Sequence, residues 1–379
     1  MTEFEKIVAR LGALTFPFRI STPEGKQDFG EGAPVFEIVV RNERGRRALQ
    51  ALNQLVLIEA YMRDDIDIEG DIVKAVSLET QISDRATWLK IWRRLKPLLV
   101  GRERCNPEWI AKHYDSGNVQ LIAADMIWNT YTPGIYESKD DSLEAGAERK
   151  LKFAYDSLRL RPGDSLLEIG CGWGGFMRFC ARKGVTPTGI TLSQDQFDFT
   201  RRQLVDDKLD GEVLYQDFFS FEPERQFEAV NVMGVMEDIS DYRRFLRRVQ
   251  NWVKPGGRIY FDFATESTPF STAAFITKYI WPGTFRKVYL PEFVKAVWES
   301  PFEIASLHND RRNYWLWGEK LLERWQERRA DVLALSSEET WRMFRILYAA
   351  TAHIMSHPSY DASAMRVVLE LPGPNPIRA

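Results

Sequence analysis

Short apolar runs alternate with amphipathic runs over the second half of the chain, from about residue 150 onward. The apolar runs predict strands at residues 165–169, 188–191, 212–216, 229–233 and 257–263. The runs between them repeat apolar residues at helical spacing and predict helices at residues 176–183, 194–204 and 242–253. Strands and helices that alternate in this way predict a parallel sheet with helices on both faces.

The first 80 residues have a different pattern, which predicts a small mixed α/β unit. Residues 34–40 alternate and are rich in β-branched side chains, so they predict a strand. Residues 46–63 carry apolar side chains at helical spacing and predict one amphipathic helix, whereas the acidic residues 64–71 predict a turn. Far along the chain, residues 318–356 predict an amphipathic helical tail that packs on the domain that contains the sheet.

A basic helix that also carries tryptophan is predicted at residues 85–105, followed by a linker. Two interpretations stay open. The helix has either an ordinary solvated face, or a face that lies on an anionic membrane, because basic residues beside Trp and Leu suit a lipid interface.

The length, charge and cysteine content of the chain exclude several classes of protein. The 379 residues suffice for two domains, and the net charge of −3 argues against a general nucleic-acid binder. The three cysteines are too few for a disulfide scaffold or a zinc cluster, so a reducing cytoplasm is the expected location. The N-terminus does not read as a signal peptide, and no window reaches the roughly 18 to 20 apolar residues of a spanning helix. Any membrane contact is therefore expected to be peripheral.

The segment Leu-Leu-Glu-Ile-Gly-Cys-Gly-Trp-Gly-Gly at residues 166–175 is the most informative motif. It reads as a buried strand, a tight glycine turn and the start of a helix. Glycine reaches backbone dihedrals that other residues avoid and lets a ligand approach the main chain. In open parallel sheets, ligands bind outside the carboxyl ends of the strands. The motif therefore predicts a ligand site at this turn.

Six further segments join this turn in a pattern that resembles one family, the S-adenosylmethionine-dependent cyclopropane-fatty-acyl-phospholipid synthases and their fatty-acid-methylating relatives. The segments are Glu-Ala-Tyr-Met at 59–62 with Glu-Gly-Asp at 69–71, His-Tyr-Asp-Ser-Gly-Asn at 113–118, Gly-Ile-Thr-Leu-Ser-Gln-Asp-Gln at 189–196, Gly-Val-Met-Glu at 234–237 and Lys-Tyr-Ile-Trp-Pro at 278–282. The resemblance spans most of the chain in order.

The resemblance implies an α/β fold: a Rossmann-like class I methyltransferase domain at residues 111–379, after a smaller α+β lipid-binding domain and linker at residues 1–110. It implies an enzyme that transfers a methyl or methylene group from S-adenosylmethionine to the double bond of an unsaturated acyl chain on a phospholipid. It also suggests transient contact with the inner membrane face and a homodimer.

The same resemblance assigns cofactor-binding roles along the chain. The glycine turn would face the methionine part of the cofactor, a Tyr-Thr pair its carboxylate, a Thr and a Gln its ribose, and the residues after the third strand its adenine. The residues are Tyr131, Thr132, Gly170, Cys171, Gly172, Thr191, Leu192, Gln196, Gln216, Asp217 and Phe218.

The catalytic positions fit the family only in part. Typical members hold a bicarbonate as proton acceptor, with a Cys loop, a His, a Glu and a Tyr. Here Glu237 and Tyr314 match the Glu and the Tyr, but Pro133 stands at the Cys position and Asp262 at the His position. Proline has no N–H to donate, and a carboxylate repels an anion, so bicarbonate is expected to bind poorly. No metal site is predicted.

These departures leave two hypotheses about the reaction. In the first, Asp262 is itself the base; in the second, ring closure is lost and the enzyme only methylates. A third possibility is that Asp262 merely caps its strand and pairs with an arginine. Two rival functions also stay open: a methyltransferase for a small natural-product or heteroatom substrate, and a non-catalytic partner subunit that binds the cofactor or lipid.

Overall fold

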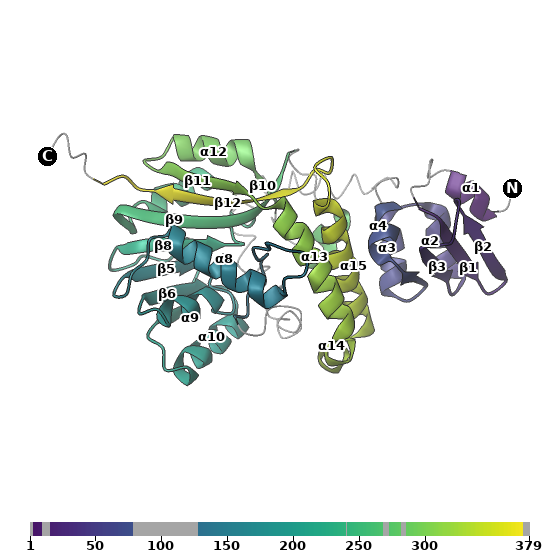
Figure 1. Ribbon diagram of the computed structural model, residues 1–379, viewed down its shortest axis with the longest axis horizontal. Coiled ribbons are helices and arrows are strands. Elements are labelled where there is room, and N and C mark those ends of the chain that lie inside the picture. Colours follow the sequence, from purple (N-terminus) through teal and green to yellow (C-terminus); the bar gives the residue numbers. More distant parts are fainter. Residues whose placement is uncertain are drawn as a thin grey trace.

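The computed structural model describes residues 3–9, 16–78, 128–239, 241–267, 273–281 and 286–373 (Figure 1). The predicted basic helix at residues 85–105 and the motif at 113–118 lie outside these residues.

The N-terminal unit, residues 3–78, contains one four-stranded sheet and short helices. Its strands, in the order β2-β1-β3-β4, are β1 (Phe18–Thr22), β2 (Gly25–Phe29), β3 (Phe36–Val40) and β4 (Ile66–Gly70). Its helices are α1 (Glu3–Ala9), α2 (Glu43–Ala51), α3 (Gln54–Met62) and α4 (Ile72–Ser77). The β1 and β3 strands pair in parallel and bring Phe18 and Phe36 face to face, with ring centroids 5.2 Å apart. The strand predicted at residues 34–40 is confirmed as β3.

Two predictions for this unit are wrong. The single helix at 46–63 is two helices, because Leu52 takes a left-handed conformation (φ 41°) and Asn53 caps α3 by accepting the N–H of Val56. The acidic turn at 64–71 contains strand β4, which pairs antiparallel with β3. Isoleucines alternate with acidic residues in β4, so Ile66 enters the core while Asp67 faces the helices.

The second part of the chain is built on an eight-stranded sheet. Seven strands follow the order β11-β12-β9-β8-β5-β6-β7, and β10 pairs with β9. The strands are β5 (Ser165–Ile169), β6 (Thr186–Thr191), β7 (Glu212–Tyr215), β8 (Phe227–Met233), β9 (Val253–Glu266), β10 (Val288–Tyr289), β11 (Glu303–Asn309) and β12 (Ser363–Glu370). All five predicted strands are present, and β5 to β9 pair in parallel. The prediction of a purely parallel sheet is wrong at one edge, where β12 lies antiparallel to β9 and β11 antiparallel to β12.

Helices cover both faces of this sheet, as the sequence predicts. They are α8 (Leu143–Ser157), α9 (Gly175–Ala181), α10 (Gln194–Asp206), α11 (Tyr242–Val249) and α12 (Leu290–Trp298), with a π-helix, η2 (Ile276–Ile280), between them along the chain. Leu151 of α8 and Phe176 of α9 pack with Leu166 on one face. Phe245 of α11 and Phe293 of α12 pack with Leu167 on the other.

The helical tail extends from α13 (Arg311–Glu327) through α14 (Arg329–Leu335) to α15 (Glu338–Met355). The sequence predicts that it packs on the sheet domain, and α13 does contact β12 and α8 of that domain. The α15 helix packs on α13 and on α3 and α4 of the N-terminal unit, where Phe344 and Tyr61 share one apolar cluster. In Figure 1, α13 and α15 therefore lie between the sheet and the N-terminal unit.

Candidate active site

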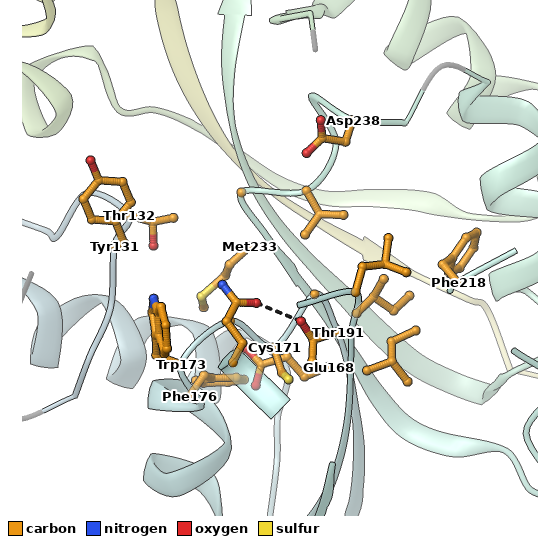
Figure 2. Close-up of a pocket in the computed structure, with 18 of the residues that line it drawn as sticks. Tyr131, Thr132, Glu168, Cys171, Trp173, Phe176, Thr191, Phe218, Met233 and Asp238 are labelled. Atoms are coloured by element: carbon orange, nitrogen blue, oxygen red, sulfur yellow. Dashed lines mark hydrogen bonds between the residues drawn. The ribbon is translucent and has the colours of Figure 1, made fainter. Parts of the chain in front are cut away.

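A pocket of about 180 Å³ opens at the carboxyl ends of β5, β6, β7 and β8 (Figure 2). Every residue that the sequence assigns to cofactor binding lines it. These residues are Tyr131, Thr132, Gly170, Cys171, Gly172, Thr191, Leu192, Gln196, Gln216, Asp217 and Phe218. The parallel strand order brings together the segments after β5, β6 and β7, because each loop leaves its strand at the same edge of the sheet, whereas Tyr131 and Thr132 come from the segment before α8.

The glycine turn after β5 presents bare backbone to the pocket. Gly170 and Gly172 have positive φ angles of 69° and 53°, which favour glycine. The N–H groups of Gly170 and Cys171 both donate to the carbonyl of Ile190 in β6, so the turn is fastened to the neighbouring strand. A Cβ atom on Gly172 would meet no heavy atom within 4 Å. The backbone of Gly172 therefore borders open space that a ligand can enter.

Thr191 and Gln196 form a fixed pair at the end of β6. The Thr191 hydroxyl donates to the amide oxygen of Gln196 over 2.8 Å, and both side chains are buried (Figure 2). Ser193 accepts the N–H of Gln196 and so caps α10, which holds Gln196 in the first turn of that helix. With its oxygen engaged, the Gln196 amide has its NH₂ group left as a donor toward the pocket.

The third wall of the pocket follows β7. Asp217 accepts the N–H of Phe219 and closes a short turn, while Phe218 stacks on Phe245 with ring centroids 4.7 Å apart. This turn gives the pocket an aromatic side with the polar Gln216 and Asp217 beside it.

The three predicted catalytic residues do not line this pocket. Glu237 is buried, one carboxyl oxygen accepts the N–H of Ala264 at 2.7 Å, and the other has no hydrogen-bond partner among the described residues. Burial raises the pKa of Glu237 to about 8. Tyr314 lies on α13 with its ring edge-on to Trp317, at a centroid distance of 5.5 Å.

Asp262 is bound to a buried cation. The ammonium of Lys150, on α8, lies 2.9 Å from the carboxylate of Asp262 and also donates to the hydroxyl of Thr132, a residue of the pocket wall. The sequence left open that Asp262 pairs with an arginine, and the partner in the structure is this lysine.

Three ionisable side chains at or beside the pocket were not assigned from the sequence: Lys150, Glu168 and Asp238. Burial raises the pKa of Glu168 to about 8 and that of Asp238 to about 7. Glu168 precedes the glycine turn and Asp238 follows Glu237, so their positions in the motifs were available signals. The signal for Lys150 is its place in the apolar stripe of α8, between Ala147 and Ala154.

Two features are absent from the residues that the structure describes. No group of three or more His, Cys, Asp or Glu side chains in this part of the chain is arranged to hold a metal ion. No helix among the same residues combines the length and apolar character needed to cross a bilayer.

Comparison with known proteins places these features in context. The model of the mycolic acid cyclopropane synthetase family matches residues 102–364, and a model of a domain of unknown function (DUF7884) matches residues 9–86. The chain is 28% identical over 272 residues to the probable fatty acid methyltransferase Rv3720 of Mycobacterium tuberculosis, an alignment that covers 67% of this chain and 61% of that protein. The chain thus spans less than two thirds of the length of this relative. It is 29% identical over 351 residues to the cyclopropane-fatty-acyl-phospholipid synthase of Escherichia coli K12, covering 85% of both.

The structure also resembles solved proteins. The crystal structure of mycolic acid cyclopropane synthase CmaA1 complexed with SAH and CTAB superposes with a TM-score of 0.64 at 19% identity, over 70% of this chain and 98% of that one. At this identity the similarity concerns the fold, and it confirms the predicted Rossmann-like α/β class.

Proposed function

Because the chain belongs to the mycolic acid cyclopropane synthetase family, we propose that it is an S-adenosylmethionine-dependent methyltransferase that acts on the double bond of an unsaturated acyl chain carried by a phospholipid. One observation carries the proposal. All eleven cofactor-binding residues expected from the sequence, although spread from Tyr131 to Phe218, line the same pocket.

The pocket also fits the cofactor by its chemistry. Gly172 offers backbone next to open space, as a close-bound ligand needs. Two buried polar atoms of its lining, the hydroxyl of Thr130 and one carboxyl oxygen of Glu168, have no hydrogen-bond partner among the described residues. Buried polar groups are nearly always paired, so these atoms support a polar ligand in the pocket.

Each wall has a part in holding the cofactor. The glycine turn and Thr132 bind its methionine end, the Gln196 amide donates to its ribose, and Phe218 with its polar neighbours binds its adenine. When bound, S-adenosylmethionine supplies a methyl group on a positively charged sulfur. The protein positions the acceptor and handles the proton that is later released.

We assign the remaining catalytic roles to two carboxyl groups, those of Glu237 and Asp262. Burial raises the pKa of Glu237 to about 8, so at neutral pH it keeps its proton, and the carboxyl oxygen that has no partner among the described residues is available to donate a hydrogen bond. The Lys150 ammonium lies 2.9 Å from the carboxyl group of Asp262 and holds it in place, and in our proposal Asp262 is the base. Tyr314 stabilises positive charge on the acceptor, since aromatic faces attract cations. Pro133 and Asp262 disfavour a bound bicarbonate.

The N-terminal unit is proposed to engage the lipid, with transient contact at a membrane surface, and the enzyme is proposed to be a homodimer. These statements rest on the motifs at residues 59–62 and 69–71 and on the family.

The test is direct. The protein is incubated with isotopically labelled S-adenosylmethionine and vesicles of monounsaturated phospholipid, and the lipids are analysed by mass spectrometry. We expect a gain of one CH₂ per acyl chain, after which NMR distinguishes a cyclopropane from a methylene branch. No labelled lipid across head groups, with label found instead on a small amine or hydroxyl acceptor, would favour the heteroatom methyltransferase.

The base assignment has its own test. Asp262→Asn keeps the shape of the side chain and removes its basic oxygen, so we expect lipid methylation to fall at least about a hundredfold, the usual contribution of a general base. Full activity of Asp262→Asn would exclude Asp262 as the base.

A further inference from the structure

The motif at residues 59–62 of the N-terminal unit contacts the rest of the protein. Glu59 of α3 accepts hydrogen bonds from the Lys278 ammonium at 2.6 Å and the Tyr279 hydroxyl at 3.0 Å, both on η2. Tyr61 accepts a hydrogen bond from the Arg345 guanidinium at 2.6 Å. Two of the four motif side chains therefore dock the N-terminal unit onto the second part of the chain.

Two arginines of α15 complete this docking. Arg342 pairs with Asp67 at 3.0 Å and Asp64 at 2.7 Å, and Arg345 also donates to the carbonyl of Ile68 at 3.2 Å. Both guanidinium groups are buried, and a buried charge requires partners in well-defined positions. These contacts fix where α15 lies relative to the N-terminal unit.

The same helix reaches the pocket wall. Tyr348, three residues after Arg345, is buried, and its hydroxyl oxygen lies 2.8 Å from that of Tyr131, which lines the pocket. Tyr348 has no other hydrogen-bond partner among the described residues, so the burial of its hydroxyl depends on Tyr131.

Tyr131 is held mainly by these C-terminal helices. Its ring packs edge-on against Trp317 of α13, with centroids 5.8 Å apart. Figure 2 shows its hydroxyl pointing away from the other labelled residues of the pocket. The ring therefore borders the pocket while the hydroxyl is anchored from outside.

We propose that docking of the N-terminal unit onto α15 positions Tyr131 in the cofactor pocket, with Tyr348 as the positioning residue. Arg345, which forms the outer contact with Tyr61, and Tyr348, which forms the inner contact with Tyr131, both lie on α15. The inference rests on the proposed function, because it concerns binding of S-adenosylmethionine in this pocket.

Removal of single hydroxyls tests the inner contact. Affinities for S-adenosylmethionine and S-adenosylhomocysteine are measured by calorimetry on the full chain. We expect Tyr348→Phe to weaken binding by about two- to tenfold, the effect of one neutral hydrogen bond, at unchanged binding stoichiometry. In a Tyr131→Phe background the same substitution should have no further effect, because Tyr348 acts through Tyr131.

The outer contact, between Tyr61 and Arg345, is tested by a substitution at Tyr61 in the N-terminal unit. Tyr61→Phe removes only the acceptor of the Arg345 hydrogen bond, and we expect it to weaken cofactor binding by about two- to threefold although Tyr61 lies outside the pocket. The matched control is Tyr260→Phe, which removes a buried hydroxyl that has no hydrogen-bond partner among the described residues. We expect its cofactor affinity to equal that of the unsubstituted protein.

The outcomes separate the two proposals. If the unsubstituted protein binds S-adenosylmethionine and either Tyr348→Phe or Tyr61→Phe binds it equally well, the inference is wrong and the proposed function stands. Additive effects of Tyr348→Phe and Tyr131→Phe would likewise overturn it. If the unsubstituted protein binds neither ligand, the proposed function fails as well.

Discussion

Lys150 is a single side chain that sets the charge of its surroundings. It is 1% exposed, and its ammonium lies among the carboxyl groups near the pocket, with Asp262 as its direct partner. Burying a lysine is expensive unless a counter-ion and further acceptors satisfy it, and here Asp262 and the hydroxyl of Thr132 do so. The pair thus connects the predicted base to the pocket wall.

We expect Lys150→Met to lower the free energy of unfolding by about 3–5 kcal/mol, because it leaves the Asp262 carboxylate buried without its cation. The double variant Lys150→Met/Asp262→Asn should recover part of this loss, since a neutral amide needs no counter-ion. Urea unfolding of both variants measures the difference. If Lys150→Met were as stable as the parent, the ion pair between Lys150 and Asp262 would not contribute to stability.

The second prediction for a single residue concerns Gly172. Alanine there would take a left-handed conformation and place its methyl group in the open space of the pocket, so we expect a loss of about 1 kcal/mol in stability and a larger loss in S-adenosylmethionine affinity. The control is Gly163→Ala, which also has a positive φ (93°) and open surroundings but lies outside the pocket. Both substitutions should destabilise, but only Gly172→Ala should weaken binding, as measured by calorimetry. If Gly172→Ala and Gly163→Ala bound S-adenosylmethionine with equal affinity, Gly172 would not be part of the cofactor site.

Among the elements, the junction of α2 and α3 depends on one cap. The Asn53 side chain accepts the N–H of Val56 and so starts α3 directly after the left-handed Leu52. We expect Asn53→Ala to cost about 1 kcal/mol of unfolding free energy, while Asn53→Asp retains the cap and most of the stability. Thermal or urea unfolding distinguishes them. Equal losses in both variants would mean that the side chain acts in some other way.

The same junction shows what the sequence can and cannot predict. Strands β5 and β8 were found because each contains a run of buried apolar residues, and the residues of the pocket were found because the motifs that contain them resemble one family. The break at Leu52 was missed because apolar spacing continues through it. The antiparallel strands β11 and β12, the docking of α15 and the partner of Asp262 were missed because they depend on contacts between distant segments.

At the scale of the whole molecule, several buried carboxyl groups make stability depend on pH. Burial raises the pKa of Glu237 from 4.5 to about 8, and Glu168 behaves in the same way. Between these values the folded protein binds a proton that the unfolded chain has lost. Each group therefore makes the folded state less stable as pH rises from about 5 to about 8, by about 1.4 kcal/mol per pH unit at most.

We expect the unfolding free energy of Glu237→Gln to fall less steeply than that of the parent over this range, because the amide cannot ionise. The exposed Glu224→Gln serves as the control and should leave the slope unchanged. Urea unfolding at several pH values gives both slopes. A Glu237→Gln slope equal to that of the parent would show that Glu237 does not hold its proton in the folded protein.

The position of β12 has a consequence for biosynthesis. This strand lies between β9 and β11, although it follows both in the chain. On a translating ribosome, the β5 to β9 part of the sheet can assemble early, but its β9 edge waits until residue 370 has left the exit tunnel. During that interval the backbone edge of β9, which later pairs with Val367 and Val368 of β12, stays open to other nascent chains. We therefore expect the nascent chain to need chaperones in the interval between the synthesis of β9 and that of β12.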